Sequence, residues 1–328
     1  MRYDYAIIAG EFLRALRGRR SQAAFSRRLG YRTNMAYVWE AGRAFPTAAN
    51  TLAAARRVGI DVQAALRRFY KAPPPWLDSI DPSTPEGVAR LMEDLRGRTS
   101  IVDLARAAGK SRFAVARWLR GEAEPRLPDF LRMIEKSSLR LLDWLASFVD
   151  LSSMPSLARA WVELEASRRA AYDVPWTQAV LRALELTGYR DLRKHEPGWI
   201  AARIGISIDD ERNCLQLLAR TGQISLRRGR WELRDVRTVD TRRDAEAEHR
   251  VKRWWAELAL ERLQAPESGL FSYNVFAVSD VDFARIQELQ LAYFRQMRAI
   301  IAESEPSQRI VLASQQLVAL DSLPSAME

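Results

Sequence analysis

An internal repeat in the first half of the chain constrains its fold more than any other feature. Residues 22–46 read QAAFSRRLGYRTNMAYVWEAGRAFP, and a diverged copy at residues 101–125 reads IVDLARAAGKSRFAVARWLRGEAEP. The two segments align without a gap at an offset of 79 positions. The identical pairs are Arg27/Arg106, Gly30/Gly109, Trp39/Trp118, Gly42/Gly121, Ala44/Ala123 and Pro46/Pro125. The sequence therefore predicts that one small structural unit occurs twice.

The glycine positions in each copy predict two short helices with a sharp turn between them. Gly30 lies where the chain must turn, because glycine adopts a positive φ without a steric penalty. This places one helix over residues 22–29 and a second over residues 33–40, and Gly42 ends the second helix. Residues 48–58 are rich in Ala and Arg and predict a further helix that closes the bundle. Such an order is typical of a helix-turn-helix unit.

The second helix of this unit has one apolar face and one exposed face. Ala36 and Trp39 are three positions apart and are expected to face the core. The residues left pointing outward are Arg32, Thr33, Asn34, Tyr37 and Val38. A helix fits the major groove of DNA, where residues near its N-terminus reach the base edges.

Four of the five outward residues have an expected contact with a duplex. Asn34 suits adenine, Arg32 suits guanine or a phosphate, and Tyr37 and Val38 suit a thymine methyl group. Two residues flank this set. Gln22 heads the first helix, where its amide can contact a phosphate and brace the second helix, and Arg43 follows the second helix and can reach the DNA backbone.

Residues 21–60 resemble the XRE (lambda repressor/Cro-like) DNA-binding domain. The residues that carry the resemblance are Gln22, Leu29–Gly30, the run from Trp39 to Arg43, Pro46 and the stretch from Arg57 to Ile60. The resemblance implies that the second helix enters the major groove. Arg32 occupies the position where the family usually has a small hydroxyl residue, so Thr33 is expected to cap the helix. The second copy keeps Ser111 at this position, but Ile101 and Leu119 replace the Gln and the Glu.

Charge is concentrated in the first copy. The chain carries a net charge of +10, and residues 1–75 alone contain 14 basic and 4 acidic side chains. The rest of the chain is balanced, with 12 of each sign in residues 76–150 and 25 of each in residues 151–328. A basic domain on a neutral body is typical of a nucleic-acid-binding protein. The alternative is a solvated helix face in a chain that uses arginine heavily.

The balanced second copy has two open interpretations. Ser111, Arg112 and Arg117 form a possible second DNA contact on its second helix. The alternative is a module kept for packing or dimerisation, because its acidic residues would repel phosphates. These acidic residues are Asp103, Glu122, Glu124 and Asp129.

Residues 197–239 change character and predict a winged-helix module. Gly205 makes a corner, and Ser207 caps a helix that starts with three acidic residues. Strands at 223–227 and 230–234 alternate around Gly229. One interpretation is a wing that contacts DNA through Arg227, Arg228 and Arg230. The favoured alternative is a protein-contact module, because the acidic helix start would face the groove.

The C-terminal segment predicts a small α+β unit. Strands are expected at 270–278 and 309–320, on either side of an amphipathic helix at 280–302. Two strands seldom form a stable sheet, so a partner chain is expected to supply another pair. From about residue 150 the order also resembles the C-terminal domain of a bacterial family of uncharacterised transcription regulators. The matching residues are Trp199–Ile200–Ala201, Gly205–Ile206–Ser207, Leu217–Leu218 through Gly222, Trp231 and the 271–278 strand.

The fold class expected is therefore mainly α, with two helix-turn-helix bundles, a winged-helix module and a small C-terminal α+β unit. The expected domains are 1–70 (XRE-like, DNA-binding), a Pro-rich extended linker 71–87, 88–150 (second helix-turn-helix), a helical connector 151–196, the winged-helix module 197–239 and a regulatory unit 240–328.

Composition excludes several other classes. The single cysteine, Cys214, allows no intramolecular disulfide, and no long apolar run predicts a membrane span. No signal peptide is apparent, so a cytoplasmic location is expected. The two histidines lack metal-binding spacing, and His195 is expected to form a solvated pair with Glu196. No phosphate loop or catalytic arrangement is present, so neither an enzyme nor a metal or cofactor is expected.

The leading hypothesis is a sequence-specific DNA-binding transcription regulator. It binds double-stranded DNA through the first copy and is homodimeric through the C-terminal half, which can also sense an unidentified effector. A second hypothesis is a protein-protein adaptor built on helix-turn-helix folds. A third is a subunit of a nucleic-acid-processing complex, either non-catalytic or with a carboxylate site assembled from distant positions.

Overall fold

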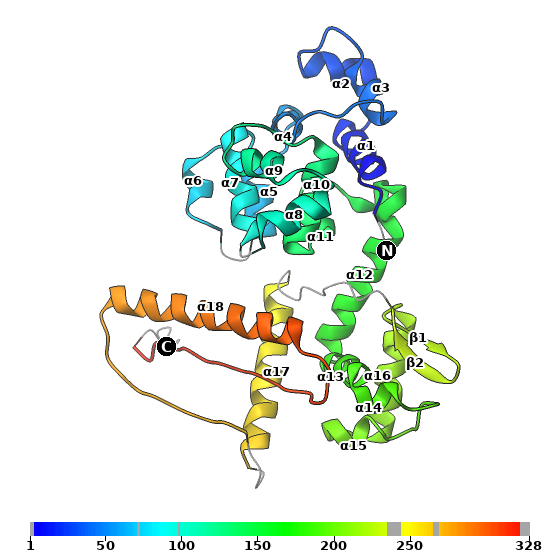
Figure 1. Ribbon diagram of the computed structural model, residues 1–328, viewed down its shortest axis with the longest axis vertical. Helices are drawn as coiled ribbons and strands as arrows, with labels where there is room; N and C mark the ends of the chain where they lie inside the picture. The colour runs from blue at the N-terminus through cyan, green and yellow to red at the C-terminus, as the bar shows by residue number, and fades with distance from the viewer. Residues whose placement is uncertain (1–2, 71–72, 98, 235–243, 265–268, 322–328) are drawn as a thin grey trace, which may run out of the picture. The chain divides into compact units, whose positions relative to one another are not determined.

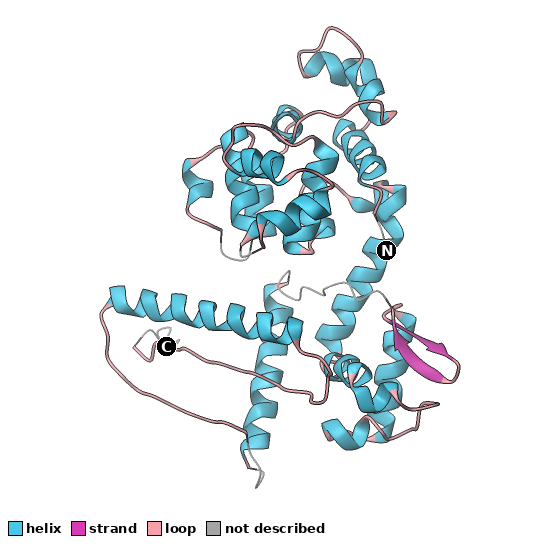
Figure 2. Cartoon of the chain, in the orientation of Figure 1, coloured by secondary structure: helices cyan, strands magenta, loops and turns pink. Residues whose placement is uncertain are grey.

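The protein is mainly helical and contains one small antiparallel sheet (Figure 1, Figure 2). A computed structural model describes residues 3–70, 73–97, 99–234, 244–264 and 269–321. The chain divides into two compact units, of which the first extends from Met1 to Ala166 and the second comprises Ser167–Arg234 and Asp244–Glu328.

The first unit contains two sets of five helices that match one another at the offset of 79 residues. We call residues 5–69 the first repeat and residues 84–148 the second repeat. The first repeat comprises α1 (Tyr5–Arg17), α2 (Gln22–Arg28), α3 (Met35–Glu40), α4 (Ala48–Arg57) and α5 (Val62–Phe69). The second comprises α7 (Pro85–Arg96), α8 (Ile101–Ala108), α9 (Arg112–Leu119), α10 (Leu127–Ser138) and α11 (Leu141–Ala146). The repeat is thus much longer than the segment in which the sequences visibly agree.

Equivalent residues precede α2 and α8, and equivalent glycines follow α1 and α7. The hydroxyl of Ser21 caps α2 by accepting a bond from Ala24 N at 3.2 Å, and that of Ser100 caps α8 by accepting one from Asp103 N at 3.1 Å. Gly18 follows α1 with φ of 60°, and Gly97 follows α7 with φ of 52°. Local sequence therefore sets the boundaries that the two repeats share.

The two repeats pair with each other through equivalent residues. Thr47 and Arg126, which are 79 positions apart, form an isolated antiparallel bridge. Ala48 N donates to the carbonyl oxygen of Pro125 at 3.0 Å, and Leu127 N donates to that of Pro46 at 3.0 Å. The bridge ties the start of α4 to the start of α10.

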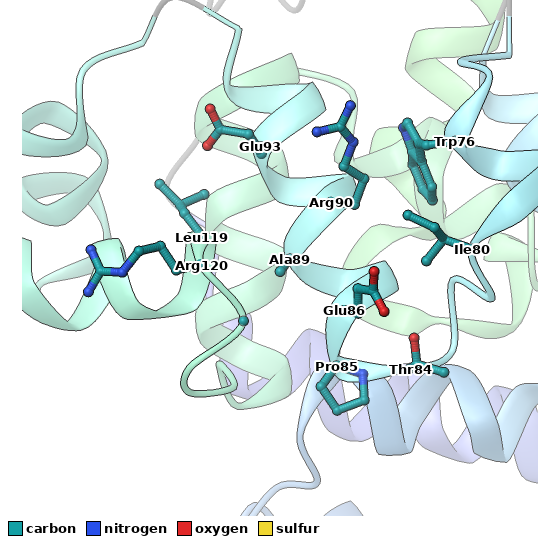
Figure 3. A pocket seen from close by; sticks show the side chains of 11 residues that line it. Trp76, Ile80, Thr84, Pro85, Glu86, Ala89, Arg90, Glu93, Leu119 and Arg120 are labelled. Atoms are coloured by element: carbon teal, nitrogen blue, oxygen red, sulfur yellow. The ribbon is translucent and has the colours of Figure 1, made fainter.

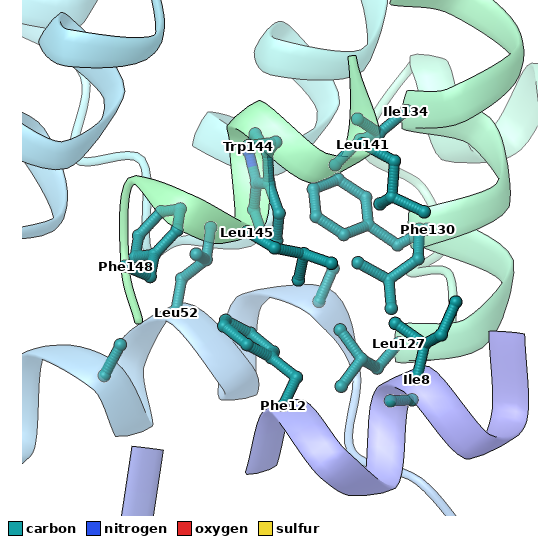
Figure 4. Packing of buried hydrophobic residues seen from close by; sticks show 14 of the residues in the cluster. Ile8, Phe12, Leu52, Leu127, Phe130, Ile134, Leu141, Trp144, Leu145 and Phe148 are labelled. Carbon is teal, nitrogen blue, oxygen red and sulfur yellow. The ribbon is translucent and has the colours of Figure 1, made fainter. Parts of the chain in front are cut away.

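A single hydrophobic core joins the two repeats (Figure 4). Trp144 of α11 is completely buried, and its ring centroid lies 5.8 Å from Phe12 of α1, 5.4 Å from Phe130 of α10 and 4.7 Å from Phe148. Because Phe12 belongs to the first repeat and the other three to the second, residues 1–70 and 88–150 are not independent domains.

The segment between the repeats also packs onto this core. Residues 76–79 form α6 (Trp76–Ser79), in which Trp76 and Leu77 are buried. The expected extended spacer at 71–87 is therefore wrong for its described part, because the two apolar side chains after the prolines gain more from burial than from exposure. After the second repeat come a short 3-10 helix, η1 (Leu151–Ser153), and α12 (Pro155–Asp173), whose later residues belong to the second unit.

Within the second unit, residues 197–234 form two helices and a hairpin in the expected order, and two further helices precede them. Its elements are α13 (Trp176–Glu185), α14 (Thr187–Arg190), α15 (Ala201–Ile204), α16 (Ile208–Arg220), β1 (Ile224–Arg227) and β2 (Arg230–Leu233). The strands pair antiparallel with Arg227 opposite Arg230, and the turn between them has positive φ at Arg228 and Gly229. Gly205 separates α15 from α16 with φ of 75°.

The C-terminal part differs from the expected α+β unit. Helices α17 (Ala245–Leu263) and α18 (Asp280–Glu303) form, and Trp254 and Trp255 of α17 pack edge-on against Trp176 at 5.0 and 6.2 Å. The segments 270–278 and 309–320 contain no strand, and Leu270 and Tyr273 are fully exposed. Among the residues that the structure describes, no neighbouring strand supplies hydrogen bonds to their alternating apolar pattern. Among the helices described, none has the length and apolar character to cross a membrane.

The shared core predicts that both repeats lose stability together. We expect Trp144→Ala to lower the free energy of unfolding of the first unit by about 3–5 kcal/mol, because it leaves a cavity among aromatic rings from both repeats. Hydrogen exchange should then accelerate in α1 and α11 alike. Val162→Ala, at a side chain that is 66% exposed, serves as the control and should change little. Faster exchange confined to the second repeat would contradict a common core.

Candidate nucleic-acid interface

Helix α3 begins two residues later than expected. Its cap is Asn34, whose Oδ1 accepts a bond from Tyr37 N at 3.3 Å, rather than Thr33. Ser26 Oγ lies 3.3 Å from Asn34 Oδ1 and accepts a bond from Ala36 N at 3.0 Å. Since Ser26 belongs to α2, these bonds fix the start of α3 against the preceding helix.

The two faces of α3 are divided as the spacing predicts. Ala36 and Trp39 are buried, and the Trp39 ring packs edge-on against Tyr31 at 5.3 Å. The opposite face exposes four of the five expected outward residues, and the fifth is half-buried. The exposed residues are Arg32, Thr33, Asn34 and Tyr37, and the half-buried residue is Val38.

Arg43 and Tyr37 form one surface at the C-terminal end of α3. The Arg43 guanidinium lies 5.1 Å from the centroid of the Tyr37 ring, and its Nη2 donates to the Tyr37 hydroxyl at 3.4 Å. Both side chains are exposed. The arginine therefore keeps most of its donors free while its position is restricted by the ring.

A buried carboxylate holds α3 from behind. The Glu40 side chain is 3% exposed, and its oxygens accept bonds from Arg17 Nε at 2.6 Å, Gln22 Nε2 at 3.0 Å and Arg14 Nε at 3.4 Å. Gln22 thus braces α3, as its position predicts, while its contact with a phosphate stays a prediction.

Sequence reasoning missed Glu40, Arg14 and Arg17 as positioning residues. The sequence offered one signal for this contact: Glu40 follows Trp39 directly and lies 18 positions after Gln22, whose amide it binds. Burial raises the pKa of Glu40, but hydrogen bonds from Arg17 and Gln22 and the charges of Arg17 and Arg14 outweigh it. The pKa of Glu40 is therefore lowered, and the carboxylate stays ionised at neutral pH.

The positive charge of the first repeat remains uncompensated around α2 and α3. Within the described residues, none of the exposed arginines of this region forms an ion pair with a carboxylate; these are Arg19, Arg20, Arg27, Arg28, Arg32 and Arg43. Elsewhere in the repeat, Arg56 pairs with Asp81 at 2.5 Å and Arg67 pairs with Asp78. The acids of the following segment thus pair with one arginine of α4 and one of α5, and across the residues described none of them pairs with an arginine of α2 or α3.

The second repeat presents the same scaffold with a neutralised surface. Ser111 caps α9 by accepting a bond from Ala114 N at 3.2 Å, as expected. Glu122 pairs with Arg120 at 2.6 Å and with Arg117 at 3.8 Å. Arg112 lies over the ring of Phe113, which is 68% exposed.

A cleft of about 710 Å³ opens beside α9 (Figure 3). Trp76 and Ile80 form one side, and Glu93 and Leu119 are among the residues that line the rest. Leu119 and Glu93 are the equivalents of Glu40 and Arg14, which are ion-paired in the first repeat. The polar contact that braces α3 is thus absent behind α9, where the corresponding space is open.

The hairpin of the second unit exposes two of its three expected arginines. Arg227 and Arg228 are exposed at the turn. Arg230 instead donates to the carbonyl oxygens of Arg190 and Leu192 and to Glu232 at 3.3 Å. Its side chain therefore holds the hairpin against α14.

His195 belongs to a buried polar chain and not to a solvated pair with Glu196. Its Nδ1 lies 3.2 Å from the Tyr189 hydroxyl, and its Nε2 lies 3.4 Å from Glu211. Glu211 is 1% exposed and also accepts bonds from Gly198 N at 3.1 Å and Ala201 N at 2.5 Å.

These groups are satisfied when the histidine is neutral. A neutral ring that carries its proton on Nε2 can donate to Glu211 and accept from Tyr189. Burial lowers the pKa of His195 despite the opposing charges of Glu211 and Glu196, and burial raises the pKa of Tyr189 to about 12. The third acidic residue at the start of α16 is therefore structural. Across the described ranges, no group of three or more His, Cys, Asp or Glu is placed to hold a metal ion.

Comparison with known families matches residues 157–320, half of the 328 residues, to the family described as Domain of unknown function (DUF4423). No XRE-like or other helix-turn-helix family is identified by this comparison. No curated protein and no solved structure matches the chain.

The bracing of α3 can be tested through its pH dependence. We expect Glu40→Gln to lower the free energy of unfolding by about 1–3 kcal/mol at neutral pH, because it removes charge-assisted hydrogen bonds to Arg17. A carboxyl whose pKa is lowered by folding contributes stability that is lost as the pH falls through the folded value. The difference from the wild type should thus shrink under acid conditions. Glu246→Gln, at an 86% exposed side chain, is the control, and a pH-independent difference would contradict this role.

Proposed function

We propose that this chain, which belongs to the family of the domain of unknown function DUF4423, is a sequence-specific DNA-binding transcription regulator. The observation that carries the proposal is the exposed α3 face, surrounded by unpaired arginines and braced from behind by the buried Glu40. A rigid helix with uncompensated positive charge has the properties that major-groove recognition requires.

In this proposal α2 and α3 act as a helix-turn-helix unit of the XRE type. Helix α3 lies in the major groove, with Arg32 and Thr33 near base edges and Arg43 on the phosphate backbone. Asn34 has a narrower role than its residue type suggests. A bidentate contact with adenine needs its Oδ1, which here accepts the capping bond from Tyr37 N. Its Nδ2 can still donate to a purine N7 or to another base acceptor.

The second unit supplies assembly and control in this proposal. Helices α15 and α16 with the β1–β2 hairpin form a winged-helix module. The first turn of α16 exposes Asp209 and Asp210, which suit a protein contact better than a phosphate contact. The apolar segments 270–278 and 309–320 are proposed to pair with a partner chain, which makes the protein a homodimer. The protein has no catalytic role in this scheme and acts in the cytoplasm, where an unidentified effector can act on the second unit.

A protein-protein adaptor is the second candidate, and the exposed apolar side chains of the C-terminal part favour it. These include Leu270, Tyr273, Val275, Val311 and Val318. Such a surface is typical of a protein interface. A gel-shift series with salt titration separates the two functions, because an adaptor binds little duplex at physiological salt.

Arg43→Ala tests the phosphate contact. We expect weaker binding to cognate and random duplexes alike, and a plot of log affinity against log salt whose slope is less steep by about 1. Arg285→Ala, at a 76% exposed side chain of α18, is the matched control and should leave the slope unchanged. An unchanged slope for Arg43→Ala would remove this residue from the interface.

Asn34→Ser tests base reading without removing the cap. Serine is as good a cap as asparagine, so α3 should stay folded by circular dichroism. We expect a loss of about 1–3 kcal/mol of discrimination at one base pair, measured on a panel of duplexes with single substitutions. An equal loss on cognate and random duplexes would argue against base reading by Asn34.

A further inference from the structure

The contact between the repeats has the form of a twofold axis. Thr47 bridges Arg126, its own equivalent, and the two hydrogen bonds of the bridge exchange roles when the repeats are exchanged. An antiparallel pairing of equivalent residues with reciprocal bonds is symmetric about a local twofold axis.

Contacts away from the bridge also pair equivalent residues or equivalent helices of the two repeats. Arg68 Nη2 donates to the carbonyl oxygen of Ser147, its equivalent, at 2.8 Å. Helix α4 contacts its equivalent α10, and α5 contacts its equivalent α11. The contact of α1 with α10 is matched by that of α7 with α4. Two identical chains in a C2 dimer contact one another in this way, and here one chain contains both halves.

The two exposed helices contact equivalent helices within their own repeats. Helix α3 packs on α1 and α2, and α9 packs on α7 and α8, so each is held by its own repeat. A DNA duplex with an inverted repeat also has a twofold axis, and paired recognition helices bind such a site about one helical turn apart. Resting on the proposed function, we propose that the first unit is an internal dimer, in which one chain binds two inverted half-sites of one duplex.

The two half-sites must differ, because the exposed faces of the repeats have diverged. Arg43 corresponds to Glu122, which neutralises its own neighbours Arg117 and Arg120. Asn34 corresponds to Phe113, an exposed apolar side chain suited to thymine methyl groups. The first repeat thus supplies most of the phosphate contacts, and the second reads its half-site with less electrostatic help.

The symmetry is tested by selecting duplexes from a random-sequence library with the full chain. We expect enrichment of two related but unequal inverted motifs, with centres about 10 base pairs apart. A short duplex carrying one such pair should bind one chain per duplex in native mass spectrometry. This ratio holds even if the second unit dimerises, since a dimer then carries two duplexes.

Each other outcome of the selection decides against a specific claim. A single undivided motif, or two chains on one short duplex, overturns the internal dimer but leaves the proposed function intact. The absence of any enriched sequence overturns both.

Replacing Glu122 by arginine, the residue type at the equivalent position of the first repeat, tests the contribution of the second repeat. We expect Glu122→Arg to raise affinity for the selected duplex about three- to tenfold and to steepen the salt slope by about 1, because it restores the residue type at the equivalent position. Glu246→Arg makes the same charge change on α17 and is the control. Equal effects of the two substitutions would show that only net charge matters and would overturn the contact by α9. No effect of Glu122→Arg would overturn it as well.

Discussion

The first unit depends on the packing of Trp144 between aromatic side chains of both repeats. With α11 over α10 and against α1, neither repeat can complete its core alone, because Phe12 of the first repeat fills the space beside Trp144 of the second. The main-chain bridge between Thr47 and Arg126 sets the register of this packing. The two copies of the five-helix unit therefore form one body with a shared core and are not two domains joined by a flexible linker.

Within that body the two copies use one scaffold for different electrostatic purposes. Glu40 binds Arg14, Arg17 and Gln22 behind α3. The exposed face of α3 keeps arginines that have no carboxylate partner in the part of the chain that the structure describes, Arg32 and Arg43. In the second repeat the acid lies on the outside, where Glu122 pairs with Arg117 and Arg120. A carboxylate thus lies behind the helix in the first repeat, whereas in the second repeat a carboxylate lies on the exposed side and neutralises Arg117 and Arg120.

The second unit is organised by a buried polar chain beside an apolar core. Glu211 accepts main-chain bonds from Gly198 in the loop before α15 and from Ala201 at the start of α15, and it lies beside a ring nitrogen of His195, which in turn contacts Tyr189. A carboxylate that is 1% exposed needs such partners, since an unpaired buried charge is strongly destabilising. Of the three acidic residues at the start of α16, Asp209 and Asp210 are exposed and interact favourably with the positive N-terminal end of the helix, whereas Glu211 holds the loop before α15 in place.

Local patterns determined much of this protein. The offset of 79 residues is visible from the identities between the two copies. The caps at Ser111 and Ser207, the turns at Gly30 and Gly205 and the hairpin around Gly229 can be predicted because each depends on the conformational preference of one or two residues. Only the tertiary structure decided how far the repeat extends, that its copies share a core, and that Asn34 caps α3. It also decided that residues 270–278 have no strand partner within the described part of the chain. These outcomes depend on contacts between residues far apart in the chain, and no periodicity or local preference records which distant side chain fills a given space.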